Sequence, residues 1–151
     1  MSTTCFLIGH HDAPESLLPL IIETVERHVV DHGVTVFTVG HYDAFDRMAA
    51  SAVKTAKQSH PEISLSLLLP YHPFDQPIEI PDGFDSTFYP PGMETVPRRA
   101  AILRANRYMI EHSDYLITYA RNHSGNTGDL VDYAKRREKK GLLHIENLFK
   151  P

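Results

Sequence analysis

The chain has 151 residues, of which 42% are hydrophobic and 23% charged, and its formal net charge is −4. These values are typical of one soluble globular domain spanning residues 1–151. The mildly acidic balance gives no general electrostatic reason to expect nucleic acid or an anionic membrane as a partner. Cys5 is the single cysteine, which excludes an intramolecular disulfide, and we expect it to be a small buried hydrophobe.

The start of the chain and its apolar runs bear on where the protein resides. No basic segment followed by an apolar stretch opens the sequence, and no apolar run approaches about 18 residues. We therefore expect a cytoplasmic protein without a signal peptide or a transmembrane helix.

The first half of the chain predicts three strands that alternate with two helices. Residues 4–8 are short and continuously apolar, as in a strand covered on both faces. Residues 15–32 carry apolar side chains at helical spacing, and residues 34–39 are rich in β-branched side chains. A second amphipathic helix is expected over 43–58, and a third strand over 63–69.

Residues 70–93 interrupt this alternation, because six of the eleven prolines lie there. We expect a long loop, and loops of this length are often functional or mobile. A solvated insertion without a role is an equally good interpretation. Five aromatic side chains favour a segment that packs over something: Tyr71, Phe74, Phe84, Phe88 and Tyr89.

The second half of the chain continues the alternation. It predicts a helix over 97–112, a strand over 115–119, a helix over about 127–140 and a short last strand over 142–145. Strict alternation indicates an α/β protein with right-handed crossovers and helices on both faces of a parallel sheet. We expect a three-layer sandwich with a five-stranded parallel sheet in the order 3-2-1-4-5.

Polar or glycine-bearing clusters follow four of the predicted strands. These clusters are Gly9-His10-His11-Asp12, Gly40-His41-Tyr42-Asp43, Pro70-Tyr71-His72 and 121–127. In a parallel sheet they meet at one edge, which is where open α/β sheets bind ligands. The predicted order reverses between the first and fourth strands, so Gly9 and Gly125 should lie at the switch point.

The segment Ser124-Gly125-Asn126-Thr127-Gly128 lies between a strand and a helix. Small residues allow a ligand to approach the backbone, and the free N–H groups of a first helical turn favour an anion. Asn126 or Thr127 could serve as the N-cap. A turn and a cap without any ligand is the plainer interpretation.

The sequence lacks two known nucleotide-binding motifs and gives little support for a metal site. The chain has neither a G-x-G-x-x-G fingerprint nor a G-x-x-x-x-G-K-[ST] loop. His10 and His11 are adjacent, so their side chains should point to opposite faces. A metal site from one of them with His41 and His123 is geometrically open, but no spacing demands it. We predict no metal and no resident cofactor.

The helix expected over 97–112 is locally basic, with Arg98, Arg99, Arg104 and Arg107. Arginine suits bidentate phosphate contacts, and Arg104 and Arg107 share a face. A solvated face, with Arg107 paired to Glu111, is the alternative.

Asp43 and Asp46 follow the second predicted strand. Asp46 could hold a ribose hydroxyl or a base edge of a ligand. Capping the following helix is the commoner fate of such an aspartate.

Taken together, these segments resemble the SLOG superfamily of Rossmann-like proteins, which is related to DprA/SMF and Lonely Guy proteins, and within it the small stand-alone YpsA-type branch. The resemblance lies in four segments that occur in order along nearly the whole chain. They are Gly9-His10-His11, the segment from Val39 to Asp46, Arg104-Ala105-Asn106-Arg107-Tyr108-Met109 before Ser113-Asp114-Tyr115-Leu116-Ile117, and Gly125-Asn126-Thr127 before Tyr133-Ala134. The chain departs from the family pattern at His11, Ala44 and Asn126.

The resemblance implies a nucleotide or nucleotide-like ligand whose phosphate lies on the Gly125–Thr127 turn, and a homo-oligomer. The residues expected to contact this ligand are Gly9, His10, His11, Gly40, Asp46, Arg104, Ser124, Gly125, Asn126 and Thr127. In the phosphoribohydrolases of this superfamily a catalytic glutamate follows the threonine by three residues, and that position is Leu130 here.

The missing glutamate favours a binding module or sensor over an enzyme. The alternative is an N-glycoside-cleaving phosphoribohydrolase or a deoxyribosyltransferase-like enzyme, with Asp46 or Asp129 stabilising an oxocarbenium-like centre or acting as the nucleophile. A structural or oligomer-forming protein with a vestigial site is a third reading.

Overall fold

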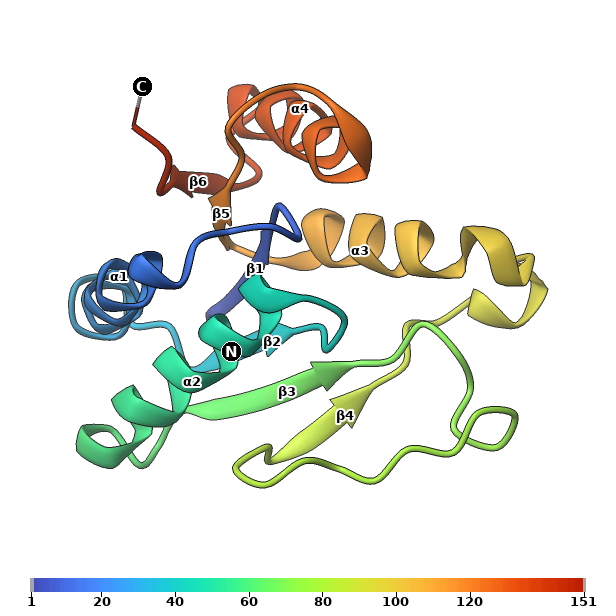
Figure 1. Ribbon diagram of the computed structural model, residues 1–151, viewed down its shortest axis with the longest axis horizontal. Coiled ribbons are helices and arrows are strands. Elements are labelled where there is room, and N and C mark those ends of the chain that lie inside the picture. The colour runs from blue at the N-terminus through green and yellow to red at the C-terminus, as the bar shows by residue number, and fades with distance from the viewer. Residues whose placement is uncertain (1, 151) are drawn as a thin grey trace.

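The computed structural model describes residues 2–150 and places a parallel sheet between helices (Figure 1). The strands are β1 (Thr4–Gly9), β2 (Val36–Val39), β3 (Ser64–Leu68), β4 (Ser86–Phe88), β5 (Tyr115–Tyr119) and β6 (His144–Asn147). The α-helices are α1 (Leu18–His32), α2 (Ala44–Ser59), α3 (Ala101–His112) and α4 (Gly125–Lys139). Short 3-10 turns precede α1 and α3. The predicted α/β class with a parallel sheet is confirmed.

The sheet has six strands in the order β4-β3-β2-β1-β5-β6, so the prediction of five strands is wrong. The additional strand, β4, lies inside the proline-rich segment that the sequence predicts as a loop. It has three residues and pairs on one side only, with Leu68 opposite Phe88. A strand this short, at an edge and half exposed, produces no detectable alternation in its sequence.

The side chain of Asp85, directly before β4, contacts both β3 and α2. The Asp85 carboxylate accepts a hydrogen bond from the Leu65 N–H (2.8 Å). It also forms an ion pair with the Lys57 Nζ (2.5 Å). The Leu69 N–H donates to the Phe88 carbonyl (2.8 Å) after the last paired residues. These pairings join residues about 20 to 28 positions apart, which local patterns cannot reveal.

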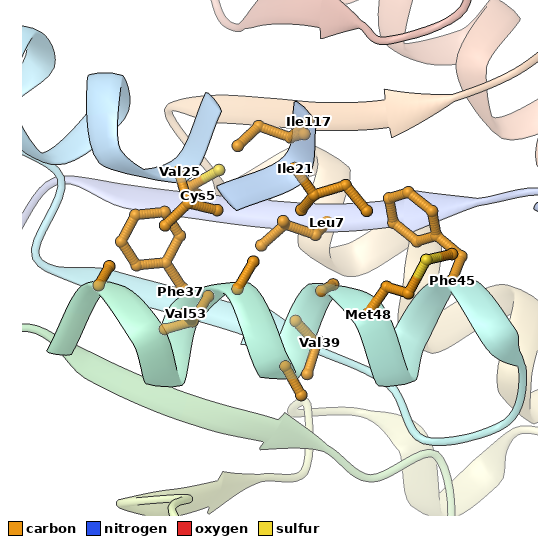
Figure 2. Close-up of a cluster of buried hydrophobic side chains, with 14 of the residues drawn as sticks. Cys5, Leu7, Ile21, Val25, Phe37, Val39, Phe45, Met48, Val53 and Ile117 are labelled. Atoms are coloured by element: carbon orange, nitrogen blue, oxygen red, sulfur yellow. The ribbon is translucent and has the colours of Figure 1, made fainter. Parts of the chain in front are cut away.

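Each face of the sheet carries its own hydrophobic core. Figure 2 shows the core on the side of α1 and α2, where Phe37, Phe45 and Ile21 are fully buried with Cys5 and Leu7. Burial raises the pKa of the Cys5 thiol, which therefore stays neutral, as expected of a small buried hydrophobe. The second core lies on the side of α3 and α4 and contains Phe6, Ile110, Leu116 and Leu143.

The alternation of neighbouring residues between the two cores explains the continuously apolar strands. Phe6 belongs to one core and Leu7 to the other, so β1 is covered on both faces. No helix of residues 2–150 has both the length and the apolarity needed to cross a membrane.

The switch point lies at β1, as the sequence predicts. β1 pairs with β2 on one side and β5 on the other, and Gly9 is opposite Tyr119. From β1 the chain builds β2, β3 and β4 outward in one direction, then returns to place β5 on the other side of β1. The loops after β1 and β5 consequently leave the sheet side by side, which opens a crevice between them.

Candidate ligand-binding site

A cavity of about 380 Å³ opens at the carboxyl ends of β1 and β2. Nine of the ten predicted contact residues line it: Gly9, His10, His11, Gly40, Asp46, Ser124, Gly125, Asn126 and Thr127. The tenth, Arg104, is exposed and lies outside the lining. The fold thus brings nine predicted residues from three separate segments, 9–11, 40–46 and 124–127, to one edge of the sheet.

Backbone N–H groups at the N-terminus of α4 adjoin this cavity. Ser124 occupies the N-cap position, so the prediction of Asn126 or Thr127 as the cap is wrong. Its side chain does not cap the helix, because the Ser124 Oγ donates to Asn122 Oδ1 (2.5 Å) instead. Within residues 2–150 no acceptor meets the N–H groups of Gly125, Asn126 and Thr127. Such a turn is suited to an anion.

Two close approaches hold the start of α4 in place. A Cβ on Gly128 would lie 2.4 Å from the backbone carbon of His123, so this position has no room for a side chain. The Thr127 Oγ1 donates to the Gly9 carbonyl (3.3 Å) and ties α4 to the end of β1. Gly125 has φ +73°, which is the left-handed region that favours glycine.

Asp46 is a buried carboxyl in the cavity wall, with 7% of its surface exposed. Its Oδ2 accepts a hydrogen bond from the Tyr42 N–H (3.0 Å), and its own N–H donates to Asp43 Oδ1 (2.9 Å). Asp43 is therefore the N-cap of α2, and the alternative that Asp46 fills this role is wrong. Burial, with Asp43 nearby, raises the pKa of Asp46 to about 7.

The two adjacent histidines differ in burial although both line the cavity. His10 is 8% exposed, and its backbone N–H donates to the Tyr119 carbonyl (3.0 Å). Burial, followed by the charge of Arg121, lowers the pKa of His10, which is therefore neutral at pH 7. Its Nε2 is buried and meets no partner within residues 2–150. His11 is exposed at the rim.

The histidines considered for a metal site are not gathered in this cavity. His41 and His123 are not part of this cavity lining, and His123 pairs instead with Asp132 (2.8 Å). Across residues 2–150, no group of three or more histidine, cysteine, aspartate or glutamate side chains is arranged to hold a metal ion.

An ion pair at the rim was missed by the sequence analysis. Arg121 Nη2 contacts both carboxylate oxygens of Asp12 (2.6 and 2.7 Å) and joins the loops that follow β1 and β5. Both residues belong to the predicted polar clusters. The signal that could have identified the pair is their opposite charge on loops that the predicted strand order makes adjacent.

The arginines of the third predicted helix do not line this cavity. Arg107 packs 4.3 Å from the Tyr133 ring and pairs with Glu111 (3.6 Å), while Arg98 packs 4.3 Å from the Tyr71 ring. The face of α3 toward the cavity instead contributes Ile102, Ala105 and Asn106. Their spacing of three and four residues is the pattern that could have identified this face.

No protein-family model matches the chain, and no curated protein sequence matches it. Solved structures do resemble it. The molybdenum cofactor binding protein from the phototrophic bacterium Rippkaea orientalis matches with a TM-score of 0.61 at 16% identity, over 98% of this chain and 79% of that one. The molybdenum cofactor carrier protein from Chlamydomonas reinhardtii matches with a TM-score of 0.61 at 15% identity, over 98% and 92%. At these identities the likeness shows a shared Rossmann-like fold.

Proposed function

We propose that this chain binds a phosphorylated heterocyclic ligand, a nucleotide or a nucleotide-derived compound, and acts as a binding module or sensor. The observation that carries the proposal is the N-terminus of α4, where three backbone N–H groups without protein acceptors in residues 2–150 adjoin the cavity at the switch point of the sheet. The phosphate of the ligand rests on Gly125–Thr127.

The dimensions and composition of the cavity support a small ligand. Its volume of about 380 Å³ is within the usual range of small-molecule sites. Apolar residues from β1, β3 and α3, among them Ile8, Leu68 and Ile102, contribute walls that suit a ring system. We also infer that the chain is a SLOG-type domain of the YpsA branch, acts in the cytoplasm and assembles with copies of itself.

The molybdenum cofactor is a second ligand candidate, favoured by the names of the structural neighbours. This cofactor is a pterin that carries a phosphate, so it shares with a nucleotide the combination of a phosphate and a heteroaromatic ring. The anion turn at Gly125–Thr127 serves both ligands in the same way, and a binding assay separates them.

A thermal-shift panel of nucleotides, nucleosides, ADP-ribose and the molybdenum cofactor tests the proposal. We expect phosphorylated members to raise the melting temperature and nucleosides to raise it less. Asn126→Asp adds a negative charge at the anion turn, where it is compatible with the helix dipole but repels a phosphate. This variant should stay folded and lose the ligand-induced shift.

A matched control makes the same amide-to-acid change elsewhere. Gln58 is exposed near the far end of α2 and does not line the cavity, so Gln58→Glu should retain the shift. The proposal is contradicted if no member of the panel changes the melting temperature of the wild-type protein.

N-glycoside cleavage is the alternative function, and one observation supports it. Asp46 is a buried carboxyl in the cavity, whereas Asp129 is exposed and lies outside the lining. Leu130 lines the cavity at the position of the expected glutamate. Incubation with AMP and with deoxynucleosides tests this alternative, and it fails if no free base appears.

A further inference from the structure

Asp46 is the only cavity-lining carboxyl in residues 2–150 that is buried, and no cation lies within ion-pair distance of it. Asp12 pairs with Arg121, and Asp43 caps α2 with its side chain. A buried carboxylate without a cationic partner is costly, so the pKa of Asp46 is raised to about 7 and the neutral acid is the favoured form below that pH.

The orientation of the Asp46 carboxyl is fixed from three sides. The Tyr42 N–H bonds its Oδ2, and Asp43 Oδ1 holds the backbone of the same residue. On the third side lies Gly40, where a Cβ would approach Oδ2 to 2.8 Å. Because Oδ2 already accepts from Tyr42, the acid proton of the neutral form belongs on Oδ1.

The groups around Asp46 leave it without a compensating charge. Arg47 on the same helix favours the charged form only weakly compared with burial and with the repulsion from Asp43. Across the cavity lie His10 and His11 from the loop after β1 and the paired Asp12 and Arg121. The side chains that α3 contributes to the lining are uncharged.

We propose that Asp46 determines ligand specificity by donating a hydrogen bond from its neutral carboxyl to an acceptor atom of the ligand's heterocycle. This inference rests on the proposed function and narrows it. The ligand must present a ring nitrogen or a ring carbonyl oxygen at the end of the cavity formed by β2 and α2. Contacts to ribose hydroxyls would not depend on the protonation of Asp46 in this way, because the carboxylate and the neutral acid can both accept hydrogen bonds from a hydroxyl.

The test compares AMP and GMP with ribose 5-phosphate by isothermal titration calorimetry between about pH 6 and pH 8.5. Ribose 5-phosphate lacks the base but carries the same type of phosphate, which itself titrates near about pH 6. The ratio of the affinities for nucleotide and sugar phosphate therefore isolates the contribution of the base. For the wild-type protein we expect this ratio to fall about tenfold as Asp46 ionises.

Two substitutions of Asp46 separate donation from a merely structural role. Asp46→Asn retains a donor and an acceptor without a titrating proton, so the ratio should be independent of pH and remain near the wild-type value at about pH 6. Asp46→Leu should give, at every pH, a ratio about tenfold below the wild-type value at about pH 6, since leucine can donate nothing. Circular dichroism checks that each variant is folded.

Asp43→Asn gives an independent test through the pH at which the affinity ratio falls. This pH would not change if Asp46 had only a structural role. Asparagine caps a helix as well as aspartate does. Removing the charge of Asp43 should lower the pKa of Asp46, because Asp43 contributes to its upward shift. The fall in the affinity ratio should then occur at a lower pH than in the wild-type protein.

The outcomes distinguish this inference from the proposed function. If ribose 5-phosphate binds but the ratio stays near one or constant with pH, the role of Asp46 is overturned while phosphate binding stands. A ratio that still falls with pH in Asp46→Asn also overturns it, because another group is then titrating. If neither the nucleotides nor the sugar phosphate bind, the role of Asp46 is overturned, and the thermal-shift panel decides the proposed function.

Discussion

At the scale of single residues, Asp46 lowers stability at neutral pH. The ordinary pKa of an aspartate is 3.8, and burial raises that of Asp46 to about 7. Between these values the folded protein retains a proton that the unfolded chain releases, so the contribution of Asp46 to folding stability decreases as the pH rises from about 4 to 7. Residues that oppose stability in this way are concentrated at functional sites.

Asp46→Asn should therefore stabilise the protein in a pH-dependent manner. The pKa difference corresponds to about 4 kcal/mol as an upper value, reached above about pH 7. Below about pH 4 the variant and the wild-type protein should have similar unfolding free energies, because Asp46 is then protonated in both states. Urea unfolding at a series of pH values measures this difference, and parallel profiles for the two proteins would contradict the account.

At the scale of elements, the first turn of α4 depends on Gly128. Replacing glycine by alanine within a helix usually stabilises it by about 0.5–1 kcal/mol. At Gly128 the added Cβ would lie 2.4 Å from the His123 backbone, so the sign should reverse. We expect Gly128→Ala to reduce the unfolding free energy by about 2 kcal/mol.

The control for this prediction is Gly33→Ala, where the added Cβ meets nothing within 4 Å. There the loss should be limited to the backbone strain of a left-handed residue, about 1–2 kcal/mol. Gly128→Ala and Gly33→Ala should differ in ligand binding more than in stability, since only Gly128→Ala displaces the Gly125–Thr127 turn. An unchanged or increased stability of Gly128→Ala would show that the turn has room to adjust.

The position of the edge strand β4 depends on the side chain of Asp85. Its carboxylate accepts from the Leu65 N–H and pairs with Lys57, so Asp85→Ala leaves that N–H without its acceptor. We expect faster hydrogen exchange of the Leu65 and Leu69 amides, whereas amides of the central strand β1 keep their protection. Uniform acceleration across the sheet would instead indicate global destabilisation.

At the scale of the whole molecule, hydrophobic periodicity predicted the helices, five of the strands and the edge of the sheet that carries the cavity. Apolar runs such as residues 4–8 are long enough to be recognised, and the glycine-bearing clusters mark their ends. β4 was missed because three half-exposed residues carry no periodic signal. The predicted strand order places the loops of Asp12 and Arg121 side by side, but their pairing depends on side-chain positions that strand order does not give.

The arginines of α3 also show that residue type alone does not predict which side chains line the cavity. Residue type suggested a phosphate contact, but the turn of the helix directs Ile102, Ala105 and Asn106 to the cavity and leaves Arg104 exposed. The proposed anion site consists of backbone N–H groups, and the Ser124 side chain does not cap them because it bonds Asn122 instead. Composition cannot show this arrangement, because it depends on the geometry of one loop.

The central claim is that a ligand phosphate rests on the first turn of α4. Titration of ¹⁵N-labelled protein with AMP, and separately with ribose 5-phosphate, followed by ¹H–¹⁵N correlation spectra, tests it most directly. The account predicts that the amide resonances of Gly125, Asn126 and Thr127 shift downfield with both compounds, since both place a phosphate on these donors. Saturable binding that leaves these three amides unchanged while shifting resonances elsewhere would contradict it.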